Sequence, residues 1–118
     1  MTGSTGYHAG LAAEESVARD YAQRNHCIAA RRWRGRSGEI DLIAREGETV
    51  VFVEVKKSRD FASAALRLGR RQMDRICASA GEFLASEPKG QLTDVRFDLA
   101  MVNAVGAIKV IENAFMEA

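Results

Sequence analysis

Residues 38–44 read Gly-Glu-Ile-Asp-Leu-Ile-Ala and residues 50–56 read Val-Val-Phe-Val-Glu-Val-Lys, and these two stretches decide the fold. Both alternate with a period of two, the pattern of β-strands, and the short turn at 46–49 predicts an antiparallel hairpin. The apolar residues at 40, 42, 44, 51, 53 and 55 are expected to share one face. The opposite face then carries carboxylates where part of a core is expected.

A symmetric hairpin places Asp41 opposite Glu54 and Glu39 opposite Lys56, with Cβ atoms about 5 Å apart. Two carboxylates at that separation repel each other by roughly 3 kcal/mol at an effective dielectric constant of about 20. A fold tolerates this repulsion only if a proton or a cation relieves it, and a divalent metal is the natural candidate.

The tripeptide Glu54-Val55-Lys56 sets a carboxylate and an ammonium on the same side of one strand. Metal-assisted phosphodiester cleavage uses these groups: carboxylates hold Mg²⁺ or Mn²⁺, and a lysine orients the water or stabilises charge on phosphorus. The backbone carbonyl of Val55 is a further candidate ligand. The alternative is an ordinary cross-strand pair of Glu39 and Lys56, with Asp41 and Glu54 on a solvated face. Because Ile43 and Phe52 continue the charged face as apolar residues, we expect a helix to cover part of it.

The rest of the chain predicts a compact α/β domain. Residues 1–8 are expected to form a flexible tail, and residues 9–118 a single domain. Helical spacing predicts a helix over 9–24, ended by Asn25, and a long amphipathic helix over 62–86. Strands are expected at 27–33, 95–102 and 108–111. The order αβββαββ implies a central mixed sheet, an antiparallel three-stranded meander plus returning strands, flanked by helices.

Composition narrows the function classes. The chain has 118 residues, 47% of them hydrophobic and 28% charged, with a net charge of +1. Its two cysteines and two histidines make a poor zinc set and favour a reduced compartment. Neither a signal peptide nor an apolar stretch of membrane-spanning length is evident, so we expect a cytoplasmic protein with no membrane partner.

Basic residues gather in two stretches. Residues 21–38 contain no acid, and their arginines surround an aromatic ring at Arg31, Arg32, Trp33, Arg34 and Arg36. This run can grip phosphates while Trp33 stacks on an unpaired base, or Trp33 can lie in the core with the arginines solvated. The long helix offers a second phosphate-facing surface with Arg71, Gln72 and Arg75, although a solvated face is the commoner outcome for such a run. Arg96 and Asp98 share a strand face and are expected to form a structural ion pair.

The first helix adds a further carboxylate. Glu14 and Glu15 flank its apolar stripe on either side, so periodicity leaves open which of them points inward. Both can also be solvated side chains that complement the helix dipole.

A helical glutamate, then Gly-Glu-Ile-Asp-Leu-Ile-Ala, then Val-Phe-Val-Glu-Val-Lys resembles the PD-(D/E)xK nuclease superfamily with its restriction-endonuclease-like core. More closely, the chain resembles the YraN-like family of uncharacterised bacterial proteins, which are similar to archaeal Holliday junction resolvases. The resemblance covers nearly the whole chain. Further motifs that carry it are Trp33-Arg34, Ala80-x-x-Phe83-Leu84, Arg96-Phe97-Asp98 and Asn113-Ala114-Phe115.

The resemblance implies that Asp41 and Glu54 are metal ligands, that Lys56 is the catalytic lysine and that Glu15 is the helical acid completing the site. The chain departs from the family pattern at three positions: Glu14 stands for a glycine, Ala22 for a leucine and Gln72 for a lysine. Of these, only Gln72 is expected to touch the site.

Two functions follow as expectations. The first is a Mg²⁺- or Mn²⁺-dependent endonuclease that cuts DNA, including branched or structured DNA. The second is a module of the same fold that binds nucleic acid or a protein without turnover. Analogy with the junction resolvases also suggests a homodimer.

Overall fold

The computed structural model describes residues 2–115, with side chains described from residue 10 onward. Its elements are α1 (Thr2–Gln23), β1 (Cys27–Arg34), β2 (Glu39–Glu46), β3 (Thr49–Lys57), α2 (Phe61–Leu66), α3 (Arg70–Leu84), the 3-10 helix η1 (Gly90–Leu92), β4 (Val95–Val102) and β5 (Ile108–Ile111).

The five strands form one mixed sheet in the order β1-β2-β3-β4-β5. β1, β2 and β3 are the predicted antiparallel meander, β4 returns parallel to β3, and β5 pairs antiparallel with β4. A parallel neighbour requires a crossover, which α2 and α3 provide. The predicted α/β class with a helix-flanked mixed sheet is therefore confirmed.

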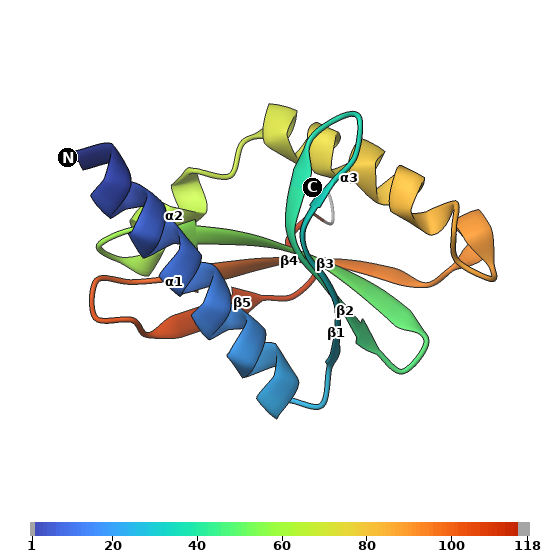
Figure 1. The fold of residues 1–118 in the computed structure, drawn as a ribbon, viewed down its shortest axis with the longest axis horizontal. Helices are drawn as coiled ribbons and strands as arrows, with labels where there is room; N and C mark the ends of the chain where they lie inside the picture. Colours follow the sequence, from blue (N-terminus) through green and yellow to red (C-terminus); the bar gives the residue numbers. More distant parts are fainter. Residues whose placement is uncertain (1, 116–118) are drawn as a thin grey trace.

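Helices cover both faces of the sheet (Figure 1). α1 buries Val17 and Tyr21 against Leu42, Val51 and Val53 on one face. On the other face, α3 packs Ile76, Ala80 and Leu84 on Ile43 and Phe52, and α2 packs Ala64 on Leu99 and Met101. The helix expected over Ile43 and Phe52 is therefore α3.

The sheet forks between β2 and β3. Their ladder runs from the pair of Glu46 with Thr49 to the pair of Leu42 with Val53, and this register is the predicted one. Beyond Leu42, β2 stays paired with β1, while β3 stays paired with β4 as far as Lys57. Figure 1 shows β1 and β2 turning away from β3 past this point. The fork leaves a gap in the sheet at Asp41.

The fork overturns two expectations drawn from a regular hairpin. Glu39 does not lie opposite Lys56, because it pairs with Arg34 of β1 instead. Ile40 does not share a face with Leu42, because it belongs to the cluster under α3. The alternation also breaks in the neighbouring strand, where Arg32 has a left-handed φ of 51°.

The helices differ from prediction in two places. The single helix predicted over 62–86 is two helices, because α2 ends at Leu66 and the extended Gly69 precedes the start of α3 at Arg70. Asp60 caps the start of α2 through a 2.7 Å bond from Ser63 N. Leu66, within the helix predicted to be amphipathic, is 87% exposed at the end of α2. α1 begins at Thr2, so residues 2–8 are helical where a tail was expected; extending a helix costs little once it has been nucleated. Asn25 ends α1 with a φ of 66°, as predicted.

No helix within residues 2–115 combines the length and apolar character needed to cross a membrane.

Candidate active site

Asp41 occupies the gap at the fork. Its Oδ2 accepts a 2.8 Å hydrogen bond from the backbone N–H of Val55, two residues past the last pair of the β2–β3 ladder. The Asp41 carboxylate thus accepts the hydrogen bond from Val55 N–H that the backbone of β2 would accept in an unbroken ladder. This bond holds the Asp41 side chain between the diverging strands.

Glu54 lies beside Asp41 and is only 5% exposed. Its Oε2 accepts a 2.5 Å hydrogen bond from Nε2 of Gln72 in α3 and lies 3.3 Å from Nζ of Lys56. Gln72, predicted to face nucleic acid, is therefore a partner of Glu54. The structure brings together Asp41, Glu54 and Lys56, the three residues that the sequence placed at the centre of the site.

Burial raises the pKa of both carboxyl groups. Burial, followed by the charge of Asp41, raises the pKa of Glu54 to about 8, and Lys56 opposes this only in part. Burial also raises the pKa of Asp41, although its bond from Val55 N pulls the other way. The contact between the two carboxyls lowers the pKa of Asp41 and raises that of Glu54. The fork therefore sets two carboxyl groups beside a single lysine.

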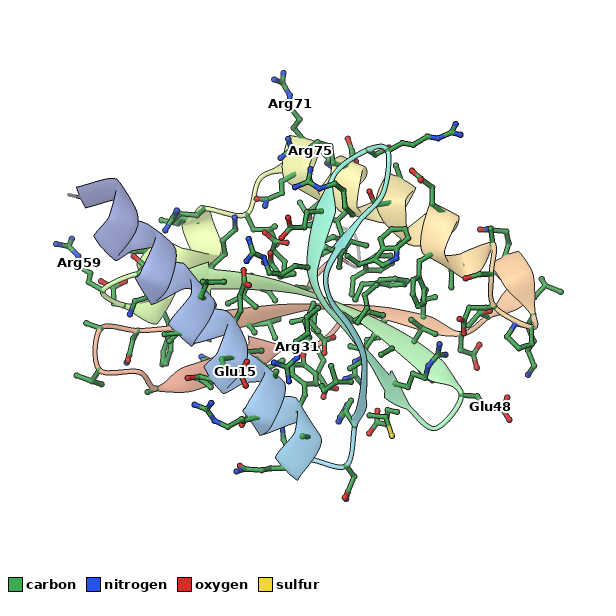
Figure 2. All side chains as sticks on the ribbon, in the orientation of Figure 1. Glu15, Arg31, Glu48, Arg59, Arg71 and Arg75 are labelled. Carbon is green, nitrogen blue, oxygen red and sulfur yellow. The ribbon has the colours of Figure 1, made fainter. Side chains whose placement is uncertain are left out.

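Glu14, rather than Glu15, is the α1 carboxyl beside Asp41. Burial and the charge of Asp41 raise the pKa of Glu14 to about 7, and the two carboxyls share a hydrogen bond. Glu15 instead lies 2.5 Å from Nη1 of Arg31 and 3.9 Å from Arg19, and Figure 2 shows Glu15 and Arg31 facing each other. The helical acid implied by the resemblance was Glu15, but the structure sets Glu14 against Asp41. The expectation that only Gln72 among the three departures touches the site is wrong for the same reason.

The predicted arginine run is largely neutralised by acids. Glu15 pairs with Arg31, and Glu39 lies 3.4 Å from Arg32 and 3.3 Å from Arg34. The backbone N–H of Arg36 donates to both carboxylate oxygens of Glu82 at 3.0 Å. Sequence reasoning could not foresee these pairs because their acids lie outside the acid-free segment.

Trp33 lies against the core. Its ring contacts Phe83 edge-to-face with centroids 5.5 Å apart and packs on the cluster under α3. Of the two predicted readings, the structure favours core packing over stacking on a base. Arg71 and Arg75 are exposed near the start of α3, and Arg71 points away from the molecule in Figure 2.

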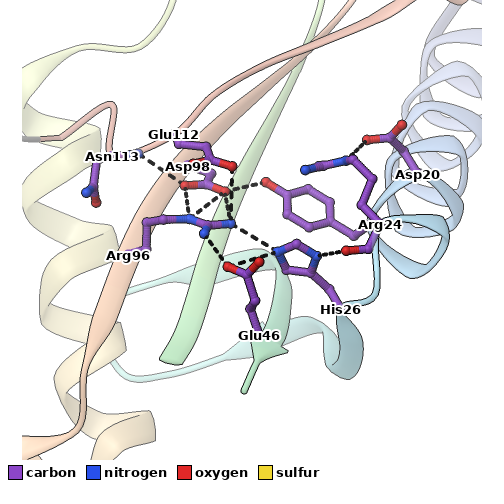
Figure 3. Close-up of polar contacts among 9 residues, drawn as sticks. Asp20, Arg24, His26, Glu46, Arg96, Asp98, Glu112 and Asn113 are labelled. Atoms are coloured by element: carbon purple, nitrogen blue, oxygen red, sulfur yellow. Dashed lines mark hydrogen bonds and ion pairs between the residues drawn. The ribbon is translucent and has the colours of Figure 1, made fainter. Parts of the chain in front are cut away.

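A second group of charged residues, predicted as a structural ion pair, is a buried network (Figure 3). The guanidinium of Arg96 binds the fully buried Asp98 at 3.0 Å and Glu46 at 2.8 Å, and lies 3.1 Å from Nε2 of His26. The Tyr21 hydroxyl donates to Asp98 at 2.6 Å. Every group has a partner, so the predicted structural role of Arg96 and Asp98 is confirmed.

The donor set at the fork suits a hard divalent cation. Mg²⁺ binds proteins through one or two carboxylates and leaves its remaining positions to water or substrate oxygens. Asp41 and Glu54 supply two such carboxylates, and a cation bound between them would relieve their mutual repulsion. Among the described residues, no group of three or more His, Cys, Asp or Glu is placed to hold a metal ion. A metal here would therefore rest on two carboxylates rather than on a closed protein cage.

Fold and site together define a small mixed α/β protein with a cluster of carboxyl groups and one lysine at a forked sheet. Residues 13–102 match the model of the uncharacterised protein family UPF0102. A UPF0102 protein of Cereibacter sphaeroides strain KD131 is 64% identical over 98% of both chains, and one of Ruegeria pomeroyi is 61% identical over 96% of this chain and 92% of its own. A more distant UPF0102 protein, from Dinoroseobacter shibae, is 44% identical over 91% of this chain and 80% of its own. The chain belongs to the UPF0102 family, which confirms the expected family of uncharacterised bacterial proteins.

Proposed function

We propose that this protein is a divalent-metal-dependent endonuclease that hydrolyses phosphodiester bonds in DNA. The observation that carries the proposal is the pair of carboxyls formed by the partly buried Asp41 and the buried Glu54, beside the ammonium of Lys56. An acid pair next to Glu-x-Lys is the arrangement for which the sequence resembles the PD-(D/E)xK nucleases.

Each residue of the site has a part in this reaction. Asp41, Glu54 and the carbonyl of Val55 would hold Mg²⁺ or Mn²⁺, which supplies Lewis acidity toward the phosphate and a more acidic water. The bond from Val55 N fixes one oxygen of Asp41, and the Gln72 amide fixes one oxygen of Glu54. Lys56, now 3.3 Å from Glu54, is placed to neutralise charge on the phosphate in the transition state. Glu14 stands next to Asp41 as its neighbour from α1.

The test compares wild-type protein with Asp41→Asn, Glu54→Gln and Lys56→Met on linear, nicked and four-way DNA with Mg²⁺ or Mn²⁺. Cleavage by the wild type and a loss of about 100-fold or more in each variant is the expected result. Calorimetry with Mn²⁺ alone should show binding by the wild type and none by Asp41→Asn. The matched control is Glu48→Gln, because Glu48 lies in the exposed β2–β3 turn, paired with Lys89 at 2.9 Å.

No cleavage of any DNA by the wild type, together with no Mn²⁺ binding, would overturn the proposal. If DNA still binds, and binds equally to Asp41→Asn, the protein is a binding module that does not turn over substrate.

A further inference from the structure

Glu14 stands between two cavities that differ in charge. On one side is a cavity of about 360 Å³, here called the acidic pocket, whose charged lining residues are Glu14, Glu15, Asp41, Arg31 and Arg32. On the other side is a cavity of about 650 Å³, here called the basic pocket, whose charged lining residues are Glu14, Lys56, Lys57, Arg59 and Arg67. Because Glu14 and Lys56 belong to the candidate active site, the basic pocket opens directly from it.

The basic pocket has an uncompensated positive charge. Glu14 is the sole carboxylate among its described lining residues, against the four cations Lys56, Lys57, Arg59 and Arg67. Arg59 lies 3.5 Å from Asp60, but neither Lys57 nor Arg67 makes an ion pair with any residue whose side chain is described. In the acidic pocket, by contrast, both arginines are paired with glutamates.

Hydrogen bonds fix the backbone that carries the cations of the basic pocket. Nη1 of Arg67 donates to the carbonyl of Lys57 at 2.7 Å, which holds the guanidinium next to the lysine. The segment after β3 is tied down as well, since Ser58 N donates to Val102 O at 3.0 Å and Ala104 N donates to Arg59 O at 3.4 Å. A pocket whose charges are positioned before binding loses less entropy when it takes up an anion.

We propose that the basic pocket holds the sugar-phosphate backbone of a nucleic-acid strand, with Lys57 and Arg67 on the phosphate next to the one at Lys56. The place of this phosphate beside the scissile bond rests on the function proposed above, whereas the binding itself does not. A cavity of about 650 Å³ is large enough for a nucleotide and much larger than a single phosphate needs. Both arginines of the acidic pocket are paired with glutamates. Phosphates are therefore bound on the Lys57 side of the site and not on the side of the acidic pocket.

Binding is measured without catalysis. A labelled 20-nucleotide strand, in single-stranded and duplex form, is titrated into wild-type protein with chelator and into Asp41→Asn protein, over a range of salt concentrations. Lys57→Met and Arg67→Met are each expected to bind about 3-fold to 10-fold more weakly at low salt. Each should also lower the slope of log affinity against log salt by about one. Lys57→Arg, which keeps the charge, should restore both values.

The matched control is Lys89→Met, which removes an exposed lysine at the far end of the hairpin, where it pairs with Glu48. It should bind as the wild type does. A mononucleotide that competes as well as the strand would place a free nucleotide in the pocket and overturn the backbone assignment. Unchanged affinity and slope in both pocket variants, or no binding of the strand by folded wild type and folded Asp41→Asn, would overturn it as well. If the wild type fails to cut DNA yet these binding results hold, only the proposed catalysis fails.

Discussion

The hydroxyl of Tyr21 donates to Oδ2 of Asp98 across 2.6 Å and so bonds α1 to β4 inside the core. Both residues are fully buried, and 77 positions of sequence separate them. Asp98 also accepts hydrogen bonds from Arg96 and from the backbone N–H of Asn113. The bond therefore anchors the helix that carries Glu14 to the strand that runs beside β3.

Tyr21→Phe should destabilise the protein by about 1–3 kcal/mol, because Asp98 loses a buried hydrogen-bond donor while the ring still fills its place. Asp98→Ala should cost more, about 3–5 kcal/mol, because it leaves the Arg96 guanidinium without its buried partner. Urea denaturation followed by circular dichroism measures both. Equal stability of Tyr21→Phe and wild type would show that the network does not hold α1 in place.

The metal-free protein should become less stable as the pH rises from about 5 to about 8. The folded pKa of Glu54, about 8, is above its ordinary value of 4.5, so folded protein keeps a proton that unfolded chain has released. The free energy of unfolding therefore falls with pH over that window and levels off above it. In chelator, Glu54→Gln should gain stability relative to wild type as the pH rises. A constant difference between the two proteins from pH 5 to pH 8 would contradict this.

The ion pair between Arg45 and Glu87 should show the opposite pH dependence. Two hydrogen bonds of 2.6 and 3.0 Å join these side chains, and the bond from Arg45 lowers the pKa of Glu87. Its stabilisation is then present above the ordinary carboxyl pKa and is lost as the pH falls through the folded value. Glu87→Gln should cost up to about 1 kcal/mol at pH 7, since Arg45 is partly exposed, and almost nothing near pH 3. Thermal melts at both pH values measure the loss, and equal losses would refute the assignment.

Glu14→Gln should reduce metal-dependent cleavage more than Glu15→Gln does. Glu14 contacts Asp41, and replacing a partner of a metal ligand costs about 10-fold to 100-fold in affinity or activity. Glu15 pairs with Arg31 on the surface, so its replacement should change stability by less than about 1 kcal/mol. Mn²⁺ titrations and initial rates separate the two variants. A larger effect of Glu15→Gln would instead identify Glu15 as the α1 acid of the site, as the resemblance implied.

Much of the fold could be predicted from the sequence because its signals are local. The period-two pattern around Asp41 and Glu54, with a four-residue turn, predicted the strands and their register. The strand at 95–102 and the stop at Asn25 followed from equally local cues. The family resemblance predicted the acid pair and the lysine that the structure brings together.

By itself, then, the sequence determined the hairpin and its register as far as Leu42 and Val53, because strand alternation and turn length depend on neighbouring residues alone. The group of Asp41, Glu54 and Lys56 followed from that register together with the family resemblance. Tertiary structure decided where the sheet forks, which α1 glutamate meets Asp41, and which cations remain unpaired. The place of the fork depends on the pairing of β2 with β1 and of β3 with β4. The unpaired cations depend on where acids distant in sequence come to lie. A helix position such as Glu14 or Glu15 acquires its role only when the helix is docked.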